Sequence, residues 1–127
     1  MFTYEIQESG DIMVLTSKGL TTVEDYQTMA PKFFEDVNAR NIRKILIDAR
    51  MFEGWDSRQS ESISFMSWSQ ARSLFDCIAV VVHDSTKSDV ARFLEFFQNA
   101  GKNVRVFQPA QYESALEWLK RHGTTNE

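Results

Sequence analysis

Cysteine and histidine are scarce in this chain, and each scarcity excludes a class of protein. The one cysteine, Cys77, lies in the apolar stretch Cys-Ile-Ala-Val-Val-Val. No disulfide can therefore form within the chain, and such a thiol behaves as a small core residue. The two histidines, His83 and His122, belong to no metal-ligand motif, and the glycines form no phosphate-binding loop. We expect a protein of the reducing cytoplasm, without a metal or another cofactor.

An excess of positive charge and a long apolar run are also missing. The formal net charge is -4, with lysine and arginine scattered along the chain, so there is no basic surface for nucleic acid. No apolar run approaches the roughly 20 residues that cross a bilayer, and the first residues, Met-Phe-Thr-Tyr-Glu, lack a signal-peptide profile. We expect a soluble protein without a nucleic-acid partner and without stable membrane insertion.

The residues that are present predict one α/β domain over residues 1–127, because 43% of them are hydrophobic and no linker interrupts the chain. Apolar runs and helical spacing alternate in the order β-β-α-β-α-β-α-β-α. The fold class is therefore a sandwich around a mixed five-stranded sheet, in which the first hairpin strand is antiparallel and the strand order stays open. Strands are expected at 2–7, 12–16, 44–50, 77–82 and 104–107; helices at about 22–39, around 63–75, from 84 or 85 to 101, and from 109.

Local signals refine these boundaries. Gly19 is expected to break the chain after the second strand, and Thr21 with Glu24 forms a capping box at the start of the first helix. Pro31 predicts a kink or a first-turn boundary in that helix, and Pro109 opens the last helix. The unbroken apolar stretch 77–82 favours the middle of the sheet.

Five short motifs carry a resemblance to a known family. They are Gly19, Ile-Leu-Ile-Asp-Ala-Arg at 45–50, Phe-Glu-Gly-Trp at 52–55, Ile-Ala-Val-Val at 78–81 and Glu-Ser-Ala-Leu-Glu-Trp-Leu at 113–119. With the element order, they make the chain resemble the SpoIIAA-like family. That family is a bacterial relative of the STAS domains, which include anti-sigma factor antagonists, and it shares its fold with the CRAL-TRIO lipid-binding domains. The resemblance implies a small cytoplasmic module without established chemistry.

In STAS antagonists the loop after the third strand carries Asp-Ser-Ser-Gly, and phosphorylation of a serine there switches binding to a partner kinase. Here Asp56-Ser57 lies at the comparable place and is followed by Arg58-Gln59, so half of that motif differs. The resemblance makes Ser57 the candidate phosphosite. A phosphate there would be repelled by Asp56 and attracted by the helix N-terminus.

The candidate ligand or partner site lies at the carboxyl ends of the parallel strands, where open α/β sheets bind ligands. We expect a set of polar and aromatic side chains to gather there: Arg50, Glu53, Trp55, Asp56, Ser57, His83 and Asp84. The structural alternative is that Asp56 or Ser57 caps the second helix while Trp55 covers the end of the sheet. Ser57, His83 and Asp48 match a hydrolytic triad only in composition, so no catalytic residue is assigned.

Surplus aromatic residues on the second helix suggest a further surface. Phe65 and Trp68 lie off the helix's core stripe, where they form a self-association surface or a gate over an apolar cavity, or are covered by the domain itself. The first hypothesis is therefore a non-enzymatic interaction or regulatory module that binds a protein partner or a second copy as a homodimer. The alternatives are a carrier or sensor of a small apolar or lipid-like ligand, and an anti-sigma antagonist-like switch at Ser57.

Overall fold

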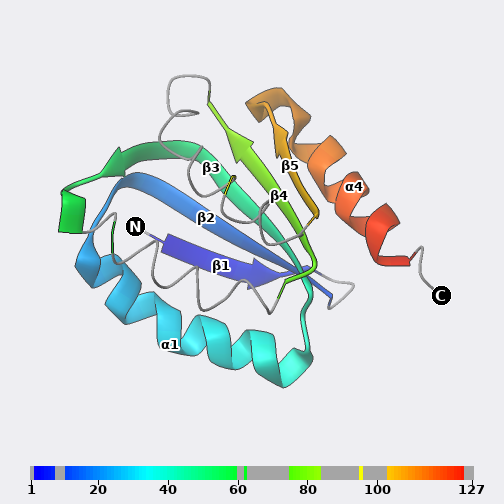
Figure 1. Cartoon of the computed structure of the whole chain (residues 1–127), viewed down its shortest axis with the longest axis horizontal. Helices are drawn as coiled ribbons and strands as arrows, with labels where there is room; N and C mark the ends of the chain where they lie inside the picture. The colour runs from blue at the N-terminus through cyan, green and yellow to red at the C-terminus, as the bar shows by residue number, and fades with distance from the viewer. Residues whose placement is uncertain are drawn as a thin grey trace.

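The computed structural model describes residues 2–7, 11–59, 62, 75–83, 95 and 103–124 (Figure 1). Two α-helices have bounds within these ranges, and the helices expected around 63–75 and before 101 lie outside them, together with Phe65 and Trp68. Ser62, directly before the first of these spans, and Glu95, within the second, are helical, whereas Phe75 is buried outside a helix.

A single mixed sheet organises the described residues, with the strand order β1-β2-β3-β4-β5. β1 pairs antiparallel with β2, and every later neighbour is parallel. The strand bounds are β1 Phe2–Ile6, β2 Ile12–Thr21, β3 Lys44–Trp55, β4 Cys77–Val82 and β5 Asn103–Phe107. The predicted mixed five-stranded sheet is confirmed, and β4 is an interior, fully buried strand beside the central β3.

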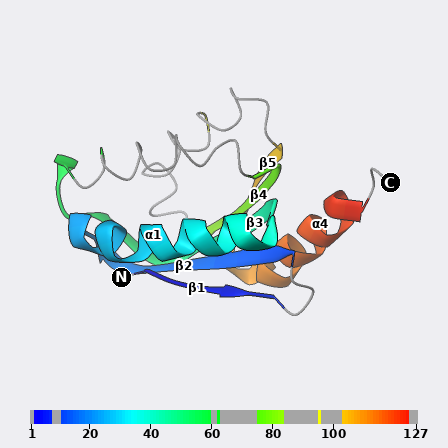
Figure 2. The ribbon, with the colours of Figure 1, turned by 90° about the horizontal axis from the view of Figure 1, so that it is seen from below.

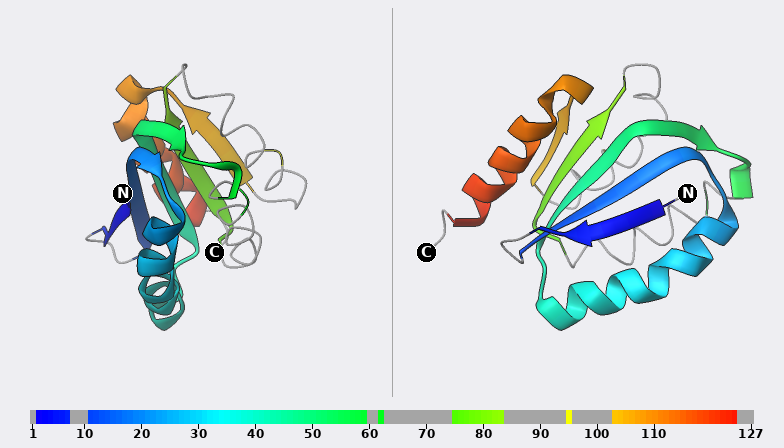
Figure 3. Two further views of the ribbon diagram at one scale, coloured as in Figure 1. Left: turned by 90° about the vertical axis from the view of Figure 1, so that its left-hand side faces the viewer. Right: turned by 180° about the vertical axis from the view of Figure 1, so that it is seen from behind.

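The two faces of the sheet carry separate apolar clusters. One cluster contains α1, Val23–Arg40. Phe33 and Val37 of α1 belong to this cluster with the β2 residues Met13 and Leu15 and the β4 residues Ile78, Val80 and Val82. The other contains α4, Tyr112–Thr124, whose Ala115 and Leu119 pack on β4. Figure 2 shows α1 lying along β2, and Figure 3 shows α1 near the β1 edge and α4 near β5. Each helix therefore covers one part of one face.

The start of α1 corrects the predicted cap by one residue. Thr22 is the N-cap, its hydroxyl accepts from the Asp25 backbone at 3.1 Å, and the Asp25 carboxylate accepts from the Thr22 backbone at 3.0 Å. The expected box of Thr21 and Glu24 is wrong because Thr21 still pairs with β3 as the last residue of β2. Pro31 lies inside α1 and forms no boundary.

The strands β2 and β3 extend further than predicted. Gly19 does not break β2, and β3 continues through Gly54 to Trp55. Both glycines have positive φ, at +68° and +111°, and the β2–β3 register shifts between Thr16 and Lys18 and again between Gly19 and Leu20. Such bulges bend a strand pair without ending it. We call the extension, residues 18–21 paired with 51–55, the β2–β3 arm.

The last helix begins later than predicted. Pro109 opens a short 3₁₀ turn, η2 Pro109–Gln111, and α4 follows from Tyr112. Proline suits this place because its backbone has no N–H to leave unpaired. The predicted inner face is confirmed, since Ala115 and Leu119 are buried and their neighbours Tyr112 and Leu116 pack against the same cluster.

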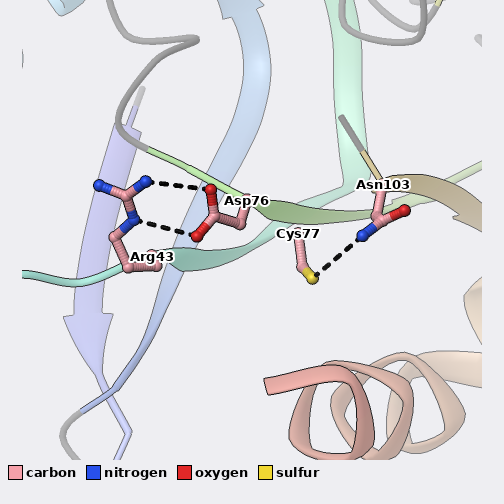
Figure 4. A network of polar contacts seen from close by, with 4 residues as sticks. All are labelled: Arg43, Asp76, Cys77 and Asn103. Atoms are coloured by element: carbon pink, nitrogen blue, oxygen red, sulfur yellow. Dashed lines mark hydrogen bonds and ion pairs between the residues drawn. The ribbon is translucent and has the colours of Figure 1, made fainter. Parts of the chain in front are cut away.

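Polar contacts join the beginnings of neighbouring parallel strands (Figure 4). Arg43, before β3, donates to the Asp76 carboxylate, before β4, at 3.1 Å and 3.0 Å. The Asn103 amide lies 4.0 Å from the Cys77 sulfur. Cys77 is buried as predicted, and burial raises the pKa of its thiol. These contacts align the beginnings of β3, β4 and β5.

Candidate functional site

The end of the β2–β3 arm holds the predicted pair Trp55 and Asp56. Thr21 pairs with Trp55, and the Asp56 backbone N–H donates to the Thr21 carbonyl at 3.0 Å. The Trp55 ring is half-buried and meets Phe52 edge to face, with centroids 5.1 Å apart. Trp55 therefore packs on the core cluster of the α1 side, which agrees with the structural alternative that it covers the end of the sheet.

The exposed residues beside Trp55 are Glu53, Asp56 and Ser57. Ser57 comes directly before the helical residues Arg58 and Gln59, as an N-terminal capping position would. Glu53 lies near Gly19, since a Cβ placed there would be 4.0 Å from the Glu53 carboxylate. The structure therefore places these three polar side chains around one end of the arm.

Arg50 lies apart from this group because its side chain contacts Asp48 and Tyr112 on the face covered by α4. Its Nε and Nη2 donate to the Asp48 carboxylate at 2.9 Å and 2.8 Å, and its guanidinium lies 4.3 Å from the centroid of the Tyr112 ring. The hydrogen bond to Asp48 raises the pKa of Arg50, and burial raises the pKa of Tyr112. Arg50 thus links β3 to the first residue of α4.

His83 is also separate from Trp55. It follows β4, whose last residue, Val82, pairs with Ala49 on β3. The β3 chain then continues for the length of the arm, so up to about 20 Å of strand separates Ala49, at the level of Val82, from Trp55. Figure 1 shows the ends of β3 and β4 diverging. The structure therefore places Trp55, Asp56 and Ser57 at the end of the arm, and Arg50 and His83 at the level where β4 ends. Asp84 lies outside the described residues.

The arm also exposes two large apolar side chains that were not predicted as site residues. Leu20 is 52% exposed and Met51 is 61% exposed, and they are the exposed large hydrophobics of the described residues. Phe52 and Trp55 pack on the core cluster of the α1 side, and Thr21 is the β2 partner of Trp55. Met51 comes directly before Phe52 and Leu20 directly before Thr21, so both apolar side chains point to the opposite face. We call Leu20 and Met51 the arm patch. Sequence reasoning missed it because both strands were expected to end before it.

Asp48 has a structural role in the α4 face. Its side chain is 8% exposed, both carboxylate oxygens accept from the Arg50 guanidinium, and one also accepts from the Arg50 backbone at 3.2 Å. A buried carboxylate requires such partners to offset its desolvation. Asp48 is therefore held by Arg50 on the face of the sheet that α4 covers.

Among the residues that the structure describes, no three or more histidine, cysteine, aspartate or glutamate side chains are grouped to hold a metal ion. None of the helices in the described ranges combines the length and apolar character that a membrane crossing needs.

Comparison with known proteins gives the family. The SpoIIAA-like family model matches residues 12–120, whereas no curated protein matches the chain. A solved structure with 19% sequence identity superimposes with a TM-score of 0.73, covering 94% of this chain and 92% of that chain. It is an uncharacterised protein of the DUF3478 family from Shewanella loihica PV-4, described as having a SpoIIAA-like fold. The sheet order, the helix positions and the family match together show that this chain belongs to the SpoIIAA-like family.

Proposed function

We propose that this protein is a non-enzymatic interaction module that uses the arm patch to bind a protein partner. The observation that carries the proposal is the exposure of Leu20 and Met51 on a strand pair that projects past its neighbours. Exposed apolar residues that share one face are a common feature of protein-protein contact sites.

The shape of the sheet explains why this surface is available. α1 packs on one face of the sheet and α4 on the other. α4 packs mainly on β4, with fewer contacts on β3 and β5. The arm patch lies beyond Arg50, which already marks the contact of β3 with the beginning of α4. A protein partner could therefore bind the arm patch without displacing α4.

Polar neighbours give this contact a means of specificity. Lys18 is exposed on the same face as the arm patch, and Glu53 and Asp56 are exposed at the same end of the arm. Charged groups at the rim of an interface steer association and reject wrong partners more than they add affinity. The preferred partner is therefore a protein whose binding surface has an apolar centre and a rim with charges of both signs.

The test compares association of the wild type with that of the double variant Leu20→Thr, Met51→Thr. Threonine keeps a residue that suits a strand and removes most of the apolar surface. Affinity capture from cells that produce the protein, with quantitative mass spectrometry, should recover partner proteins with the wild type. Their amount should fall about tenfold or more with the double variant, because a hot spot worth about 1.4 kcal/mol or more is removed.

The matched control is Gln27→Thr, which introduces the same residue at an exposed position of α1. It should retain every partner of the wild type. Light scattering with size-exclusion chromatography distinguishes a second copy of the chain from another protein. If capture and molar mass are the same for the wild type and the folded double variant, the arm patch is not the binding surface.

A further inference from the structure

We draw no further inference here: the strongest candidate, the pair of buried side chains Lys44 and Cys77 that face each other across the first rung of β3 and β4, carries nothing, because it rests on a lone cysteine whose lysine neighbour already forms an ion pair with Asp11 at 3.3 Å.

Discussion

Removal of the Arg50 guanidinium should destabilise the fold through the charge that it leaves behind. In Arg50→Met the Asp48 carboxylate loses the two side-chain hydrogen bonds at 2.9 Å and 2.8 Å and keeps only the backbone one. Removal of one partner from a buried ion pair costs about 3–5 kcal/mol. Because the Arg50 side chain is 40% exposed, water can reach the remaining carboxylate, and we expect a smaller loss of about 2 kcal/mol.

The stacking on Tyr112 adds a second contribution to the same substitution. An arginine over an aromatic ring contributes about 0.5–1 kcal/mol at a partly exposed site, so the expected loss for Arg50→Met is about 2–3 kcal/mol in total. Urea unfolding followed by tryptophan fluorescence and circular dichroism measures it as a lower midpoint at unchanged slope.

Two controls separate the ion pair from general damage. Arg43→Met removes an arginine with the same two-bond geometry, but its pair with Asp76 is 44% and 55% exposed, so the expected loss is below about 1 kcal/mol. Asp48→Asn combined with Arg50→Met should lose less than Arg50→Met alone, because no buried charge remains. The reasoning is refuted if Arg50→Met and Arg43→Met lower stability equally, or if the double substitution is worse than Arg50→Met.

Four further substitutions test the N-cap of α1, the β1–α1 contact and the bulges. Asp25→Ala should cost about 1 kcal/mol of stability at pH 7, and less as pH falls through the pKa of Asp25. Burial raises that pKa, but hydrogen bonds outweigh burial and leave it below its ordinary value. Glu24→Ala is the control, and equal losses for the two variants in denaturant titrations would contradict the cap. Burial and a hydrogen bond to Asp36 of α1 raise the pKa of Tyr4 to about 12. Tyr4 should therefore contribute stability that is lost as pH rises from about 10 through 12. If an alkaline absorbance titration of Tyr4→Phe still shows the highest tyrosine transition, this assignment is excluded. Gly54→Ala, at φ +111°, should cost about 2 kcal/mol of stability. Gly19→Asn, at φ +68°, should cost under about 1 kcal/mol, since asparagine tolerates the left-handed region. Thermal unfolding that ranks the two variants in the opposite order would disprove the backbone strain.

The sequence predicted the elements whose cause lies within a few residues. The apolar stretch 77–82 is an interior strand, the stripe of Ala115 and Leu119 is buried, and Cys77 lies in the core. Each of these depends on the local alternation or helical spacing of apolar residues, which one chain displays directly. The hairpin direction and the parallel pairing follow from the same element order.

The site was predicted less well because its geometry depends on pairing between distant strands. A glycine in a sequence reads as a break, but Gly19 and Gly54 lie within paired strands where the partner supplies the hydrogen bonds. The expected gathering of Arg50 and His83 with Trp55 was wrong for the same reason, because Ala49 pairs with Val82 and places both residues at the level where β4 ends. The sequence does not show that β3 continues past the end of β4, or that the Arg50 guanidinium lies over the Tyr112 ring.

The sequential strand order has a consequence for synthesis of the chain. Every strand pairs with the strand before it, so no later segment has to be inserted between two strands that are already joined. The sheet can therefore grow in the direction of translation, from the β1–β2 hairpin to β5, as each crossover leaves the ribosome. α4 comes last and closes the second face, which makes its docking the step that completes the domain.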